Sequence, residues 1–196
     1  MKKLAVILGL VLLFAVGATA QDKMVSYGFK AGIDMANFTG DISNNSMKVG
    51  FIGGGFVEYM VAPQIGIQLE VLYAMKGTKE DGGDGKLKFD YLEIPVLFKY
   101  IVPTQGNVSP FFFAGPQVGF LLSAKSDPGG EDIKDAFESV DFGLAFGAGA
   151  NIKMESFTLM FDGRYSLGLT NVVKDAPSGF SWKTSNIAFT VGVGFK

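Results

Sequence analysis

Ionisable side chains occupy the middle of several segments that alternate like β-strands, where charges are costly to bury. They share one phase of the alternation, and they are Lys30, Asp34, Glu58, Glu70, Glu93, Lys99, Asp162 and Arg164. Carboxylates in such positions can serve as a general acid and base, or they can line an ion path. Arg164 is the sole arginine in the sequence, and its planar guanidinium suits several carboxylates at once. We therefore predict a network in which Arg164 bridges two or more of Glu70, Glu93 and Asp162.

A structural role for these charges is favoured over a chemical one, because we expect the alternating segments to form a narrow eight-stranded barrel, and the interior of such a barrel is usually filled by side chains. Charges inside such a barrel should pair with one another. The chain contains no His and no Cys. This composition excludes Ser-His-Asp and Cys-His catalysis, metal sites of the Cys/His kind and a disulfide framework. We expect neither enzymatic activity nor a cofactor or bound metal.

Two segments of the sequence combine acidic residues with glycine, namely residues 80–85 and 127–135. Oxygen-rich segments of this kind can bind Ca²⁺. However, neither matches the spaced pattern of an EF-hand loop. We interpret both as solvated loop tips.

The elements that position the charges are predicted as eight strands, because apolar and polar residues alternate with period two. The predicted strands span residues 24–38, 48–61, 64–76, 87–101, 108–122, 140–154, 157–170 and 184–196. The connections after the second, fourth and sixth strands are short, and the others are long and rich in Gly, Asp, Asn and Ser. Short periplasmic turns alternating with longer outer loops are typical of an outer-membrane barrel. An even number of strands places both ends of the barrel on the periplasmic side.

The lipid-facing side is predicted from the chemistry of the two phases. In the last strand, residues 187, 189, 191, 193 and 195 are large and apolar and share one face. The residues between them, 188, 190, 192 and 194, are small and share the other face. Small residues suit a crowded barrel interior, whereas glycine weakens a strand exposed to solvent. The apolar face should therefore contact lipid. Five tyrosines share its phase, as expected for interfacial girdles: Tyr27, Tyr59, Tyr73, Tyr100 and Tyr165.

The N-terminus has the pattern of a cleavable export signal. Lys2 and Lys3 precede an apolar run from Leu4 to Val16, and Ala18-Thr19-Ala20 forms a small-x-small cleavage site. We expect a signal peptide over residues 1–20 and a single barrel domain over 21–196. No later segment has the roughly 20 consecutive apolar residues of a spanning helix.

The fourth predicted strand contains a recognisable motif, the run from Tyr91 to Tyr100 that reads YLEIPVLFKY. It resembles the signature of the porin-like outer-membrane β-barrel family common in Bacteroidetes, which includes PorT-like proteins. Residues 28–32, 110–116 and 191–195 are also similar to that family. The resemblance implies an outer-membrane barrel without catalytic or ligand residues, and PorT-like members are linked to protein secretion. Pro95 is unusual inside a strand, and we expect it to mark a β-bulge.

Four functions are compatible with these observations. The first is a structural or interaction barrel of the cell envelope with a lumen plugged by the charged network. The others are a small-solute porin, a PorT-like accessory barrel for protein secretion, and a soluble lipocalin-like ligand carrier. The first is favoured because a filled eight-stranded lumen conducts poorly. We expect contacts with outer-membrane lipid and lipopolysaccharide, with the barrel-assembly machinery and with envelope proteins, a monomeric state, and, without a basic stripe, no nucleic acid.

Overall fold

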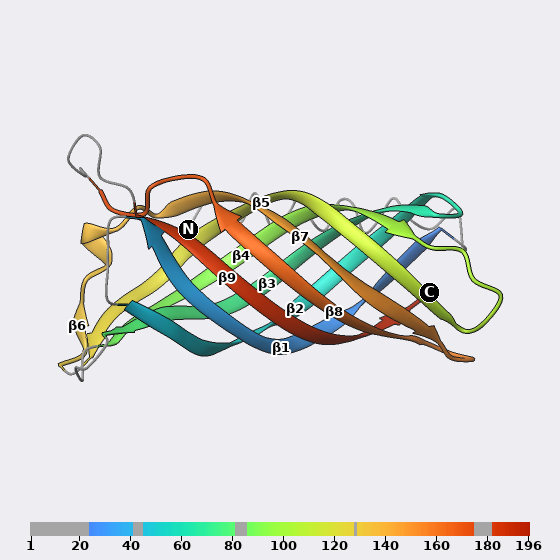
Figure 1. The fold of residues 1–196 in the computed structure, drawn as a ribbon, viewed down its shortest axis with the longest axis horizontal. Coiled ribbons are helices and arrows are strands. Elements are labelled where there is room, and N and C mark those ends of the chain that lie inside the picture. The colour runs from blue at the N-terminus through green and yellow to red at the C-terminus, as the bar shows by residue number, and fades with distance from the viewer. Residues whose placement is uncertain (1–23, 41–44, 81–85, 128, 175–181) are drawn as a thin grey trace.

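The predicted strands form a closed antiparallel β-barrel in the computed structural model (Figure 1). The structure describes residues 24–40, 45–80, 86–127, 129–174 and 182–196. The predicted signal peptide lies outside the described residues. The barrel strands are β1 (Val25–Gly40), β2 (Asn45–Ala62), β3 (Ile65–Glu80), β4 (Lys86–Ile101), β5 (Val108–Asp127), β7 (Val140–Lys153), β8 (Thr158–Gly168) and β9 (Trp182–Phe195).

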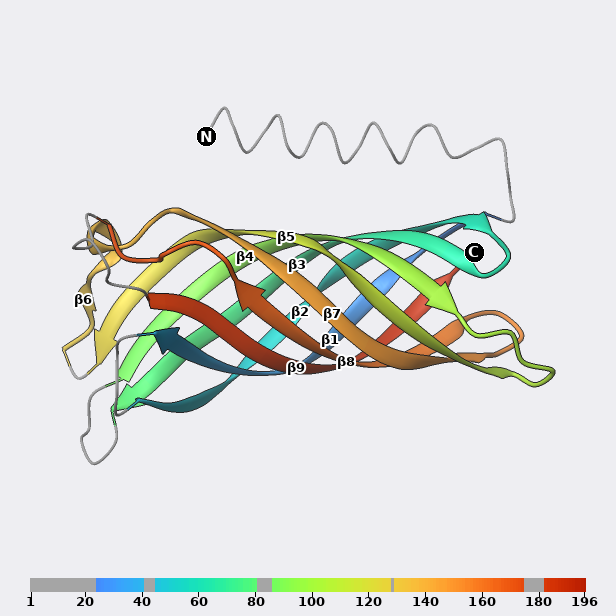
Figure 2. The same cartoon turned by 45° about the horizontal axis from the view of Figure 1, so that its top comes forward.

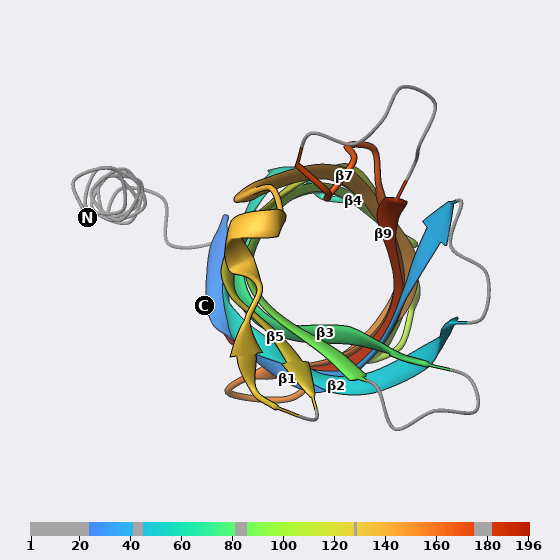
Figure 3. The same cartoon turned by 90° about the vertical axis from the view of Figure 1, so that its left-hand side faces the viewer.

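The barrel closes because its first strand pairs with its last. Each strand is antiparallel to the next along the chain, and β1 joins β9 in a register that runs from Tyr27↔Phe195 to Gly40↔Trp182. The resulting ring of tilted strands is visible along the barrel axis in Figure 3. The start of β1 and the end of β9 lie at the end of the barrel that carries the short turns, as Figure 2 shows.

The two faces of the wall differ in side-chain size, as the alternation predicts. Outward residues are large and exposed, with Phe29 at 70% and Phe98 at 58%. Inward glycines make room for rings that lie across the neighbouring strand. Phe113 of β5 covers Gly147 of β7 so closely that a Cβ atom at Gly147 would lie 2.6 Å from the ring. The narrow interior is therefore shared between aromatic rings and bare backbone.

Two details of the wall differ from the sequence expectation. Pro95 does not mark a bulge, because the β3–β4 pairs on either side of it, Leu69↔Val96 and Leu72↔Glu93, keep one register. Proline removes one hydrogen-bond donor from the ladder without displacing the strand. The irregularity of β4 against β5 lies instead between Asp90 and Tyr91, where β5 carries one extra residue.

The long connection predicted over residues 123–139 is partly ordered secondary structure. Strand β5 continues through Asp127, and the short strand β6 (Glu131–Asp132) pairs with it. A 3₁₀ turn, η2 (Lys134–Ala136), follows. These elements stand at the end of the barrel opposite the short turns (Figure 1). Among the described residues, no helix is long and apolar enough to cross a membrane.

Candidate functional site in the barrel interior

The inward phase brings all eight predicted ionisable residues into the interior. Their exposed fractions range from 0% for Asp34 and Glu70 to 7% for Glu58. They come from five strands, β1, β2, β3, β4 and β8. Two further buried polar residues, Lys76 and Asn186, extend the group. We call these ten residues together the lumen network.

The centre of the lumen network is a group of two cations and two carboxylates. Lys30 Nζ donates hydrogen bonds to Glu70 Oε1 at 2.9 Å and to Asp162 Oδ2 at 2.8 Å. Both terminal nitrogens of the Arg164 guanidinium contact the same Glu70 carboxylate, at 2.7 Å from Nη1 to Oε2 and at 3.0 Å from Nη2 to Oε1. Arg164 Nη2 also lies 3.8 Å from Asp162 Oδ1. Three strands, β1, β3 and β8, are thus joined across the lumen.

Arg164 contacts two of its three predicted candidate partners. The structure brings it to Glu70 and Asp162, whereas Glu93 pairs with Lys76. Lys76 also donates to Asn186 Oδ1 at 3.1 Å, and Asn186 Nδ2 donates to Asp34 Oδ1 at 2.7 Å. The residue that sequence reasoning missed is Lys76. It shares the inward phase of Glu70, six residues earlier on β3, so the alternation could have identified it.

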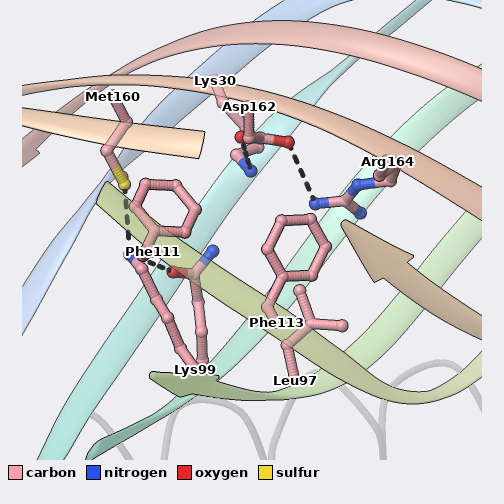
Figure 4. A pocket seen from close by; sticks show the side chains of 9 residues that line it. Lys30, Leu97, Lys99, Phe111, Phe113, Met160, Asp162 and Arg164 are labelled. Carbon is pink, nitrogen blue, oxygen red and sulfur yellow. Dashed lines mark hydrogen bonds and ion pairs between the residues drawn. The ribbon is translucent and has the colours of Figure 1, made fainter. Parts of the chain in front are cut away.

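A third group lies toward the short-turn end. Lys99 Nζ donates to Glu58 Oε2 at 2.6 Å and to Gln68 Oε1 at 3.3 Å. Gln68 in turn donates to Glu70 Oε1 at 2.6 Å, which links this group to the centre. Met160 Sδ lies 3.5 Å from Lys99 Nζ (Figure 4). Hydrogen bonds therefore run continuously from Glu58 to Asp162.

Aromatic rings lie beside three of the four cations of the lumen network. Lys99 Nζ lies 4.1 Å from the ring centroid of Phe111, Arg164 Cζ lies 5.4 Å from that of Phe113, and Lys76 Nζ lies 5.4 Å from that of Tyr91. A cation over a ring face gains electrostatic stabilisation that grows when water is excluded. The rings come from β4 and β5, so these strands complete the enclosure of the charges.

The side chains of the central group and of the third group fill the space between them. The void bordered by Lys30, Leu97, Lys99, Phe111, Phe113 and Arg164 leaves no room for a water molecule (Figure 4). Charged groups in such surroundings are stable only when paired and hydrogen-bonded. Among the described residues, no three His, Cys, Asp or Glu side chains are arranged to hold a metal ion. Residues 81–85 of the first acidic loop, and residue 128 of the second, lie outside the described residues.

At the loop end lies a buried apolar cluster that we call the aromatic cap. Its members are buried and come from β4, β5, β9 and two loops: Phe89, Tyr91, Leu121, Ala124, Phe137, Val172 and Trp182. Phe137 is central, and its ring forms edge-to-face pairs with Phe89 and with Trp182, at 4.9 Å and 5.6 Å between ring centroids. Such edge-to-face contacts add stabilisation beyond the burial of area.

Backbone hydrogen bonds join the two loops that form the aromatic cap. Phe137 forms a bridge with Val173, and the amide of Glu138 donates to the carbonyl oxygen of Val172 at 2.8 Å. The amide of Lys174 donates to the carbonyl oxygen of Ala136 at 3.1 Å. Beneath the cap, Asp141 accepts hydrogen bonds from Thr170 and Thr184, both at 2.7 Å. The loops are therefore tied to each other and to the barrel wall.

Comparison with known proteins identifies the family of this barrel. Residues 19–174 match the model of the family described as "Outer membrane protein beta-barrel domain". The chain belongs to this family. It is an outer-membrane β-barrel protein, and its apolar outward face is the surface that contacts lipid. The soluble lipocalin-like alternative is therefore wrong. No sequence among curated proteins matches the chain at a significant level.

Solved structures show the same fold at low sequence identity. Neisserial surface protein A superimposes with a TM-score of 0.55 at 20% identity, covering 85% of this chain and 96% of that one. The attachment invasion locus protein of Yersinia pestis matches with a TM-score of 0.49 at 16% identity, covering 88% and 99%. Outer membrane protein W of Escherichia coli matches at 0.47 and 13%, covering 90% and 100%. The first of these supports the eight-stranded barrel fold, and none transfers a function.

Proposed function

We propose that this protein is a closed outer-membrane barrel with a structural or interaction role, whose lumen is sealed by the lumen network. The observation that carries the proposal is the central group, in which Lys30, Glu70 and Arg164 meet in a space that leaves no room for water. A conducting pore needs a continuous aqueous path along the lumen. In this proposal the contact between Arg164 and Glu70 blocks that path.

The aromatic cap supports the same conclusion independently. It places apolar side chains over the loop end of the lumen, above the pair formed by Lys76 and Glu93. A solute entering from that end would have to displace Phe137 and the loop backbone bridged to Val173. In this proposal the short-turn end faces the periplasm and the aromatic cap faces outward. The loops then form the part of the protein available to envelope partners.

Two alternatives remain as proposals of lower rank. A small-solute porin would require the lumen network and the aromatic cap to move together. A PorT-like accessory role in secretion has support only from the resemblance of the motif around Glu93 and Pro95. Neither alternative gives the buried ion pairs a role in their observed arrangement, whereas in a sealed barrel these ion pairs block the lumen.

Electrical conductance in a planar lipid bilayer tests the proposal. We expect the refolded full-length barrel to insert without producing steady channels, while a known porin in the same bilayer conducts. Insertion is verified separately by the heat-dependent gel mobility of a folded barrel. A steady open channel from the unaltered protein would replace the sealed barrel with the porin alternative.

A further inference from the structure

The charges of the lumen network do not balance. Its four cations face five carboxylates, and these nine residues are Lys30, Lys76, Lys99 and Arg164 on one side and Asp34, Glu58, Glu70, Glu93 and Asp162 on the other. An uncompensated buried charge is costly, and such a group becomes neutral instead when it can. The imbalance therefore points to one carboxylate that carries a proton.

Asp34 is the carboxylate of the lumen network without an ion pair. The other four each contact a Lys or Arg nitrogen. Asp34 Oδ1 accepts one hydrogen bond from Asn186 Nδ2 at 2.7 Å. Among the described residues, no cation contacts Asp34, and its Oδ2 has no hydrogen-bond partner although the residue is 0% exposed. Half of this carboxyl group is thus buried without compensation.

The charged groups that face Asp34 from β3, β4 and β8 are engaged with one another or with the central group. Two cations act electrostatically on Asp34, namely Lys76 and Arg164. Lys76 is paired with Glu93, and Arg164 is paired with Glu70. Glu93 also acts on Asp34, and its negative charge disfavours a second one beside it. These neighbours therefore leave Asp34 without a counter-ion of its own.

The strands on either side of β1 contribute no charge directly opposite Asp34. The opposite residues are Gly50 on β2 and Ala188 on β9. Lys48, two residues from Gly50, donates through Nζ to a backbone carbonyl of β3 at 3.3 Å. Lys30, on the same strand as Asp34, donates to two carboxylates of the central group. The surroundings of Asp34 thus favour an uncharged carboxyl group.

Asp141 provides a comparison, because it is another buried aspartate with no ion pair among the described residues. It is 8% exposed, and its two oxygens accept hydrogen bonds from Thr170 and Thr184, both at 2.7 Å. Hydrogen bonds to both oxygens stabilise an ionised carboxylate. Asp34 has one such hydrogen bond, so the two aspartates should differ in protonation.

We propose that Asp34 is a proton-binding site inside the barrel, and that the lumen network is electrically neutral when this proton is in place. A neutral carboxyl group needs no counter-ion, and the proton also removes the repulsion between Asp34 and Glu93. Loss of the proton would make both carboxylates compete for Lys76. The site rests on the contacts of Asp34 and not on whether the barrel conducts ions.

Infrared spectroscopy of the folded full-length barrel tests this site, in micelles of a detergent that has no carbonyl group. A protonated carboxyl group has a C=O stretching band that an ionised carboxylate lacks. At about pH 6, roughly two pH units above the point where an exposed aspartate ionises, we expect this band from the unaltered protein. Asp34→Asn should lose it, whereas the matched control Asp141→Asn should keep it. Asp34→Ala serves as a second variant if Asp34→Asn folds poorly.

Urea unfolding provides an independent measurement, because the proton leaves Asp34 when the unfolded chain exposes it. Between about pH 4.5 and pH 6, the unfolding equilibrium constant of the unaltered barrel should rise about tenfold per pH unit relative to that of Asp34→Asn. Equal infrared bands from the unaltered protein and a folded Asp34→Asn barrel would overturn the proposal. So would loss of the band in Asp141→Asn, or the same pH dependence of unfolding in the unaltered protein and Asp34→Asn.

Discussion

The middle and the loop end of the barrel interior are held together by opposite kinds of chemistry. The middle uses full charges, with Glu70 shared by Lys30 and Arg164. The loop end uses apolar contacts centred on Phe137. The charges are anchored on strands of the barrel wall, so their loss should affect the whole barrel. The aromatic cap is partly built from loops, so its loss should act locally. Burial alone therefore does not determine how much of the structure a side chain supports.

The largest effect is expected from Arg164→Leu. The substitution leaves Glu70 without its bidentate partner inside the barrel, and breaking a buried pair costs about 3–5 kcal/mol. We expect the free energy of unfolding to fall by that amount, measured by urea titration in lipid vesicles. The double variant Arg164→Leu/Glu70→Leu should regain most of the loss, because it removes both charges. Unchanged stability of the single variant would show that Arg164 does not hold the lumen network together.

A smaller loss is expected when the packed middle is overfilled. Gly147→Val places methyl groups against the Phe113 ring and the backbone of β8, where even a Cβ atom is too close. Overpacking of this kind costs about 1–3 kcal/mol. The same urea titration measures it, with Gly106→Ala as control because nothing lies within 4 Å of that position. Equal stability of the two variants would mean that the middle has spare room.

Phe137→Ala should change global stability least and local structure most. Removing a buried phenylalanine ring costs about 3–5 kcal/mol where it packs. Because the aromatic cap joins two loops, we expect this loss to promote local opening, with cleavage by trypsin after Lys134 and Lys174 at least tenfold faster. The urea midpoint of the barrel should stay close to that of the unaltered protein. A large shift of that midpoint would make the cap part of the same cooperative unit as the lumen network.

Much of the wall could be predicted from the sequence, and less of the interior. The period-two alternation located all eight strands, because a lipid-facing barrel must place apolar residues on every second position. It also placed Arg164, Glu70 and Asp162 on the inward phase. It did not determine which charges meet, because partners such as Lys76 and Glu93 depend on the register between strands. The register of Lys76 is fixed by its pairing with Phe89 across β3 and β4.

The aromatic cap was not predicted for a different reason. Phe137 and Val172 lie in segments rich in polar residues and glycine, where no periodicity indicates burial. Their positions follow from the bridge between Phe137 and Val173 and from the extension of β5 beyond residue 122. Both features depend on contacts between distant segments, which the alternation within one strand does not indicate. Pro95 shows the converse, since a residue expected to disrupt its strand is accommodated without a change of register.

The most direct test of the account compares conductance in two variants of the same barrel. K30A/E70A/D162A/R164A removes two cations and two carboxylates, so the charge balance of the interior is kept while the central group disappears. We predict steady ion channels in a planar bilayer when these four substitutions are combined with Phe137→Ala, which opens the aromatic cap as well, and none from Phe137→Ala alone, with both variants folded by gel mobility. A folded combined variant that stays closed, or a Phe137→Ala barrel that conducts, would contradict the claim that the lumen network is the main seal.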